Sequence, residues 1–107
     1  MEPVEINAGA WYLRAPRADD RVDDRPALAE LGEDRAGYVE ALASQWDSEQ
    51  LYSWAVCEPT TGELLAEVTL DPVTRAVATR FRPGEQEAAR TGTEAVRRFA
   101  EAMLGGD

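Results

Sequence analysis

The sequence has no histidine and no lysine, and Cys57 is its only cysteine. Without an imidazole, the chain has no histidine to act as a general base, as the partner of a nucleophile or as a metal ligand. A zinc site built from cysteine and histidine is therefore excluded, and we expect no bound metal. Because a lone cysteine forms no disulfide within the chain, its presence fits a protein of the reducing cytoplasm.

Long hydrophobic runs are also missing, so the sequence predicts no membrane-spanning helix and no membrane partner. The first ten residues are acidic and lack the apolar stretch of a signal peptide, which agrees with a cytoplasmic location. The hydrophobic content of 44% in 107 residues predicts one globular domain over residues 1–107. Within this domain, residues 1–9 are expected to form a flexible N-terminus.

Positive charge is scarce, because 11 basic residues, all arginine, stand against 21 acidic residues and leave a net charge of −10. Such a surface repels the phosphate backbone, so no nucleic-acid partner is expected. Two interpretations of the charge remain. It can simply keep the chain soluble, or it can steer the chain towards a basic partner.

Hydrophobic periodicity predicts an α+β fold with a mainly antiparallel four-stranded sheet, two helices after the first strand and one C-terminal helix. The expected order is strand, helix, helix, strand, strand, strand, helix. Asp24 and Asp34 are predicted to cap the first two helices. The strands are expected at residues 11–14, 51–58, 64–70 and 76–81, with short turns between the last three.

The last helix has its own start signal in Thr91-Gly92-Thr93-Glu94, which matches a capping box. The glycine pair at 105–106 is expected to end it. Its predicted inner face consists of Gly92, Ala95, Val96, Phe99 and Met103.

Four segments, read in order, resemble the GNAT superfamily of N-acetyltransferases, in particular the branch similar to ribosomal-protein N-acetyltransferases. They are YLRAPRADD (12–20), SWAV (53–56), TGELLAEVTL (61–70) and TEAVRRF (93–99). They are similar to the family's opening strand, its second and third strands, and the helix behind the acetyl-CoA pyrophosphate. The resemblance implies a truncated, N-terminal half of the fold. The family continues with a strand, a helix and a strand pair, which complete the acyl-CoA cleft and the amine-substrate site.

The family's phosphate loop, Gln/Arg-x-x-Gly-x-Gly/Ala, is altered in this chain. Alignment on residues 93–96 places Glu87 at the Arg/Gln position, Arg90 at the first glycine and Gly92 at the last small residue. Glycines in this loop let backbone N–H groups approach the pyrophosphate at the helix N-terminus. Glu85 and Glu87 would instead repel it. The run from Glu85 to Arg90 also favours helix, so it can extend the helix backwards over the site.

If acetyl-CoA binding is retained, the resemblance implies that the cofactor-binding residues are Arg82, Arg90, Thr91, Gly92 and Thr93. Arg82 lies near the place where family members hold pantetheine. Arg90 would replace the lost backbone donors with a charged side chain. Without that binding, no cofactor is expected.

The catalytic candidates are few. Glu67 is a candidate for a carboxylate that relays water, and the alternative is a solvent-facing side chain on a strand. Cys57 is either a nucleophile or a small half-buried strand residue, and no basic residue close to it in the sequence would lower its pKa. Trp11, Trp46 and Trp54 either line a ligand groove or, as we favour, anchor the core.

Three functions remain open. The altered loop favours a catalytically degenerate GNAT-like domain that acts by self-association or by binding a protein partner. The alternative is an acetyl-CoA-dependent N-acetyltransferase whose site is completed by a second chain. A third interpretation, based on charge alone, is an acidic inhibitor or antitoxin-like binding protein. Because no strand follows residues 76–81, we expect an open sheet edge there and a homodimer or a heteromeric complex.

Overall fold

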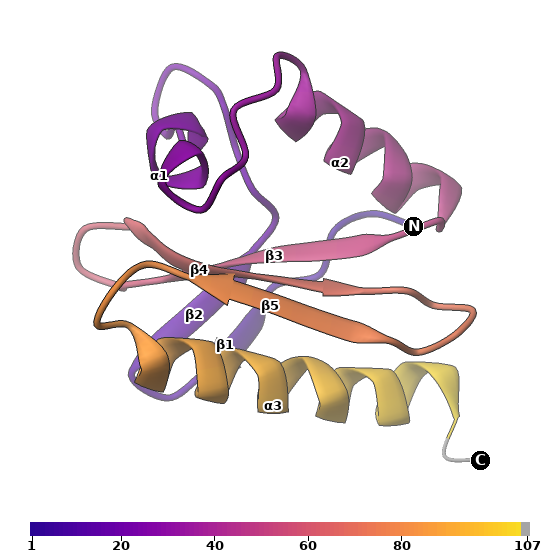
Figure 1. Cartoon of the computed structure of the whole chain (residues 1–107). Coiled ribbons are helices and arrows are strands. Elements are labelled where there is room, and N and C mark those ends of the chain that lie inside the picture. The colour runs from indigo at the N-terminus through magenta and orange to yellow at the C-terminus, as the bar shows by residue number, and fades with distance from the viewer. Residues whose placement is uncertain (106–107) are drawn as a thin grey trace.

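The computed structural model describes residues 1–105 and arranges them as a sheet between two helical layers (Figure 1). In chain order the elements are β1 (Ile6–Ala8), β2 (Trp11–Arg14), α1 (Arg25–Glu30), α2 (Tyr38–Ser48), β3 (Tyr52–Cys57), β4 (Leu64–Leu70), β5 (Val77–Phe81) and α3 (Gln86–Leu104). Over these residues the fold is α+β, with a five-stranded antiparallel sheet, three helices and a long C-terminal helix. The predicted α+β class is confirmed.

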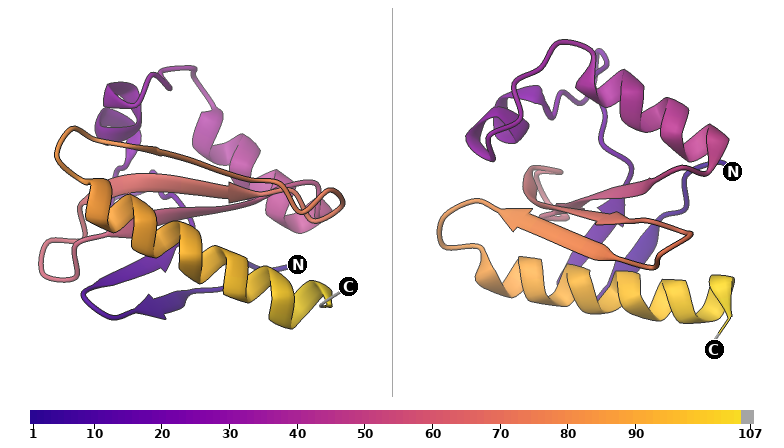
Figure 2. Two further views of the ribbon diagram at one scale, coloured as in Figure 1. Left: turned by 60° about the horizontal axis from the view of Figure 1, so that its bottom comes forward. Right: turned by 45° about the vertical axis from the view of Figure 1, so that its right-hand side comes forward.

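The strands lie side by side in the order β1-β2-β3-β4-β5, and every neighbouring pair is antiparallel. The helices α1 and α2 cover one face of the sheet, and α3 lies across the other (Figure 2). The central strands β3 and β4 are almost wholly buried, whereas β1 and β5 form the two edges.

The predicted four-stranded sheet was wrong, because it omitted β1. This strand forms a hairpin with β2 through a turn at Gly9, whose φ is +67°. The indole of Trp54 donates a hydrogen bond to the carbonyl of Val4 at 2.7 Å and holds the preceding residues on the core. Part of the segment expected to be flexible, residues 1–9, is therefore a strand. Its three residues are too few for alternation to show in the sequence.

The starts of α2 and α3, predicted from local capping motifs, were wrong. The helix α2 begins after Gly37, not after Asp34. The helix α3 begins at Gln86, so the predicted capping box at Thr91 lies inside it. The backward extension expected from the helix-forming residues 85–90 therefore occurs. The glycine pair at 105–106 was predicted to end this helix. Gly105 does follow its last residue, and Gly106 lies outside the described residues.

The side chain of Arg75 holds the end of α3 against the turn between β4 and β5. Its guanidinium donates hydrogen bonds to the carbonyls of Leu104 at 2.5 Å and Gly105 at 2.7 Å. A cation at this position complements the partial negative charge of a helix C-terminus.

Aromatic side chains form the centre of the core. Trp46 and Trp54 are buried, which confirms them as core anchors, and Trp11 is half-buried. The ring of Trp46 stacks on Tyr52 at a centroid distance of 4.7 Å, and Trp54 meets Phe99 of α3 edge-on at 5.2 Å. Contacts of this kind join α2, β3 and α3 into one core.

The inner face of α3 differs from the prediction at one position. Ala95 and Val96 are buried as expected, whereas Met103 is 57% exposed. The last turns direct Ala100 and Leu104 towards the core instead, so the prediction for Met103 was wrong.

Candidate functional site

The residues expected to cradle a phosphate lie within a helix. Thr91, Gly92 and Thr93 are interior residues of α3, where backbone N–H groups bond to carbonyls one turn earlier. The hydroxyl of Thr93 donates to the Ala89 carbonyl at 2.7 Å and shares a hydrogen bond of 2.6 Å with Thr79 of β5. These three residues therefore present no free row of N–H groups to a ligand.

Gly92 faces the sheet rather than a ligand. A Cβ built on it would lie 2.6 Å from Cγ2 of Val56 and 3.4 Å from Cγ2 of Val68. The absence of a side chain thus lets α3 approach β3 and β4 closely. This glycine has a packing role in the fold.

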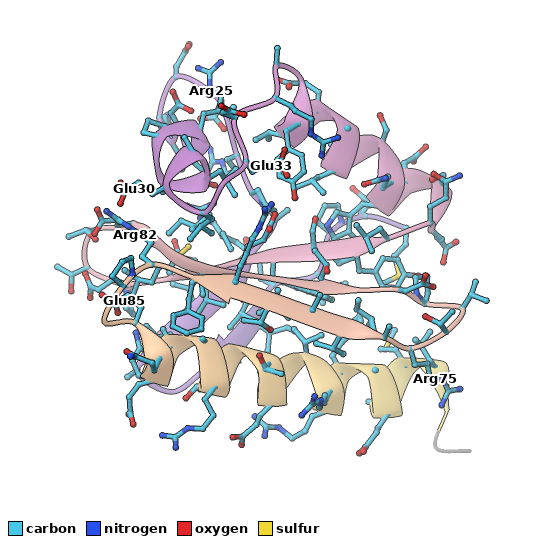
Figure 3. The ribbon with its side chains drawn as sticks, in the orientation of Figure 1. Arg25, Glu30, Glu33, Arg75, Arg82 and Glu85 are labelled. Atoms are coloured by element: carbon cyan, nitrogen blue, oxygen red, sulfur yellow. The ribbon has the colours of Figure 1, made fainter. Side chains whose placement is uncertain are left out.

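The actual start of α3 is surrounded by acidic groups (Figure 3). Arg82 forms ion pairs with Glu63 at 3.0 Å and with Glu30 at 3.1 Å, so its charge is already matched. The hydrogen bond that the guanidinium of Arg82 donates to the Glu63 carboxylate is the main reason that the pKa of Arg82 is raised. Glu85 and Glu87 lie at the first turn of α3, where carboxylates favour the helix and repel phosphate.

Arg90 does not point to this helix start as a free cation. It pairs with Glu87 at 2.6 Å on the exposed surface of α3, one turn away along the helix. Exposed pairs of this kind contribute little to stability. The side chain of Arg90 is nevertheless already engaged with a carboxylate.

Glu67 is buried on β4, and the expectation of a solvent-facing side chain was wrong. Only 3% of it is exposed, because α2 and the loop before it cover this face of the sheet. One carboxylate oxygen accepts a hydrogen bond from the Tyr38 hydroxyl at 2.5 Å. The other accepts one from Nε of Arg80 at 2.6 Å.

The polar cluster around Glu67 joins four parts of the chain. Arg80 also donates to the Tyr38 hydroxyl and to Glu33, each at 3.1 Å, and Glu33 pairs with Arg35 at 2.7 Å. Burial, and then the hydrogen bond to Glu67, raises the pKa of Tyr38, so its hydroxyl remains a neutral donor. The cluster forms the floor of an open hollow between α2 and β5. Within this cluster the carboxylates of Glu33 and Glu67 are paired with the guanidinium groups of Arg35 and Arg80.

Cys57 is not placed to act as a nucleophile. Its side chain is fully buried, and burial raises the pKa of the thiol to about 12. A thiol with this pKa stays protonated at neutral pH, and only the thiolate is an effective nucleophile. Cys57 is therefore a small core residue, more buried than expected.

A buried ion pair between Arg14 and Asp24 was not predicted from the sequence. Arg14 of β2 and Asp24 are 4% and 3% exposed, and they meet through two hydrogen bonds of 2.7 and 3.0 Å. Arg14 also donates to the Gly62 carbonyl at 2.9 Å, and the Arg17 amide donates to Asp24 at 2.7 Å. Asp24 precedes α1 as predicted, yet its carboxylate bonds to these groups and does not cap the helix. The only sequence signal was an arginine in a short hydrophobic strand.

The outer edge of β5 has no paired strand in the described part of the chain. Two backbone hydrogen bonds of 3.0 Å flank β5: the Asp71 amide donates to the Ala76 carbonyl, and the Arg82 amide donates to the Leu65 carbonyl. They show which N–H and C=O groups of β5 point towards β4. In an antiparallel pair the direction alternates, so Ala78 and Arg80 bond to β4. The N–H and C=O groups of the three other strand residues, Val77, Thr79 and Phe81, consequently point outwards.

Apolar surface accompanies this open edge. Phe81 at the end of β5 is 42% exposed. Val77 at its beginning lines a groove with Arg97 and Ala100 of α3. The edge thus combines unpaired backbone groups with an exposed aromatic ring.

The chain matches no family model, no curated protein and no solved structure. Among residues 1–105, no three side chains of His, Cys, Asp or Glu are grouped so that they could hold a metal ion. No helix within the same residues combines the length and the apolarity needed to cross a membrane.

Proposed function

We propose that this chain is a catalytically degenerate GNAT-like domain that works by binding protein through the open edge of β5. The order of elements supports the first part of this proposal. The segments that resemble the family fall on β2, β3, β4 and α3, and the expected order of strands and helices is kept, with β1 added in front.

The geometry at the start of α3 supports the loss of catalysis. The N–H groups that would bind the pyrophosphate are inside the helix, and Gly92 is packed against Val56. Carboxylates surround the helix start, and Arg82 there is already paired with two of them. Bringing a highly charged pyrophosphate to this position costs electrostatic energy.

The observation that carries the proposed binding function is the orientation of the β5 backbone. Val77, Thr79 and Phe81 direct their N–H and C=O groups away from β4, and no described strand meets them. Open edges pair readily with another strand, and peptides and partner proteins commonly bind by adding a strand in this way. The exposed ring of Phe81 adds apolar surface to the same edge.

The test is light scattering of the purified chain at micromolar concentration, beside the variant Val77→Pro. The N–H of Val77 faces outwards, so proline there removes no bond to β4 but blocks an added strand. We expect the variant to remain folded and to lose association. The matched variant Ala78→Pro removes a bond to β4, so it should lower the melting temperature much more.

Two results would contradict this function. One is association of Val77→Pro that equals that of the parent chain. The other is a parent chain that stays monomeric and has no ligand protein whose binding the proline blocks.

A second candidate function, N-acetyl transfer in a site completed by a second chain, is favoured by one observation. Glu67 and Tyr38 place a carboxylate and a hydroxyl under a hollow that opens beside β5. Both oxygens of Glu67 are, however, occupied by donors from this chain. Binding of acetyl-CoA separates the two functions, because only N-acetyl transfer requires it.

A further inference from the structure

The outward-facing groups of β5 are arranged symmetrically about Thr79. This residue is the middle one of the five in the strand, and Val77 and Phe81 lie two residues to either side. We infer that the occupant of this edge is a second copy of the chain, whose β5 runs antiparallel with Thr79 on the two-fold axis. This inference rests on the function proposed above and names the partner.

In this pairing every outward-facing group finds a partner. Thr79 of one copy exchanges two hydrogen bonds with Thr79 of the other, and Val77 does the same with Phe81 of the other copy. All five residues of both strands then lie opposite a strand residue. A symmetric interface of this kind uses the same patch twice.

Neighbouring registers are less favourable. If the two-fold axis moves by one residue to Arg80, this residue lies opposite Arg80 of the other copy. Like charges directly opposite each other are destabilising. This register also uses Pro83, which has no N–H to donate. If the axis moves instead to Ala78, Phe81 lies opposite Arg75 of the other copy. The φ of Arg75 is +66°, so this residue is not in the extended conformation of a strand. The pairing centred on Thr79 avoids these penalties.

The side chains fit the same register. Thr79 bonds to Thr93, so the side chains of Val77, Thr79 and Phe81 lie on the α3 face of the sheet. Pairing brings the exposed ring of Phe81 beside Val77 of the other copy, at the groove that Val77 lines with Ala100. An aromatic ring opposite a β-branched side chain is a favourable cross-strand pair.

The opposite face also accepts this pairing. Arg80 points towards Tyr38 and Glu67, and in the proposed register it lies opposite Ala78 of the other copy. Ala78 is exposed and small, so it leaves room for the long arginine side chain. No arginine of β5 meets an arginine across the axis.

Amide hydrogen exchange, measured by NMR at rising protein concentration, tests whether a second copy of the chain binds to β5. The amides of Val77, Thr79 and Phe81 should exchange fast in dilute solution and at least about tenfold more slowly as the dimer forms. The amides of Ala78 and Arg80 already bond to β4 and should stay protected at every concentration. Equal, concentration-independent exchange at the three outward positions would overturn the inference.

A double-mutant cycle tests the register. Val77→Lys and Phe81→Glu should each weaken the dimer by about tenfold, because each change alters both symmetry-related pairs. The double variant should recover most of this loss, since lysine and glutamate then face each other across the interface. Within one strand the two positions are about 13 Å apart, so coupling cannot arise inside a single chain. Additive losses would overturn the register.

The results also separate this inference from the proposed function. If the chain alone stays monomeric while another protein protects the three outward amides, the second copy is wrong and edge binding stands. If those amides are protected in neither case, both proposals fail. Circular dichroism of each variant verifies that it is folded before its association is compared.

Discussion

Gly92 lies where α3 approaches the sheet most closely, and its role is open to a direct test. The substitution Gly92→Ala adds a Cβ that would lie 2.6 Å from Val56, so a side chain or the helix must move. Overpacking of this kind costs about 1–3 kcal/mol of unfolding free energy, although alanine is the better helix former. Urea denaturation of the variant gives the value.

The control for this substitution is a double variant that carries both Gly92→Ala and Val56→Ala, compared with the two single variants. The smaller residue at position 56 makes room for the added methyl group, so the double variant should lose less stability than the two single losses combined. Additive losses would show that Gly92 is not required for close packing.

Two buried groups predict how stability depends on alkaline pH. Burial raises the pKa of Cys57 from an ordinary 9 to about 12, and burial followed by the hydrogen bond to Glu67 raises that of Tyr38 above its ordinary 10. Above pH 9 the unfolded chain therefore releases protons that the folded chain retains, which favours unfolding. We expect the unfolding free energy to fall by up to about 1.4 kcal/mol per pH unit and per group.

Denaturant titrations between pH 7 and 11 measure this loss, with Cys57→Ala as the comparison. In that variant the decline should begin near pH 10, where tyrosine ionises, and not near pH 9. An identical onset in both chains would contradict the assignment of the first step to Cys57.

The misplacement of Glu67 shows which information a strand pattern lacks. Alternation correctly separates Glu67 from Val68, yet it cannot tell whether the second face of the sheet is covered. The partners Tyr38 and Arg80 come from α2 and β5, far away in the sequence. The Arg14–Asp24 pair was missed for the same reason, because its geometry depends on tertiary structure.

At the scale of elements, the strands with clear alternation were predicted almost to the residue. β4 agrees with the predicted range 64–70, and β3 and β5 differ by one residue at their ends. Helix starts were less predictable because acceptable caps occur at several positions, as Asp34 and Thr91 show. Packing of the helix on the sheet decides which start is used, and a local motif does not contain that information.

The docking of α3 yields a prediction at this scale. Phe99 is half-buried and meets Trp54 edge-on, whereas Met103 on the same helix is 57% exposed. Phe99→Ala should cost about 3 kcal/mol, near the low end for a buried ring. Met103→Ala should stay within about 0.5 kcal/mol of the parent, as surface substitutions do. Similar melting temperatures for both variants would show that α3 is not firmly docked.

At the scale of the whole molecule, the proposed degenerate GNAT-like function predicts weak binding of acetyl-CoA. Glu85 and Glu87 lie at the start of α3, where they repel phosphate groups, and Arg82 is already paired with Glu30 and Glu63. Isothermal titration calorimetry should give no saturable heat at micromolar ligand. A low-micromolar dissociation constant, about −8 kcal/mol, would instead support the acetyltransferase function.

The net charge of −10 gives the proposed association through β5 a characteristic response to salt. Two copies repel each other at long range, and salt screens this repulsion, because the screening length is about 10 Å at 0.1 M. The backbone hydrogen bonds and apolar contacts proposed at the interface are not weakened by screening. We therefore expect self-association to strengthen several-fold as sodium chloride rises from about 0.05 to 0.5 M. Sedimentation velocity provides the dissociation constants, and the Val77→Lys/Phe81→Glu double variant is the control, since its added ion pairs should weaken with salt. If association of the parent chain fell with salt, opposite charges would be driving it, as expected for an acidic module that binds a basic protein.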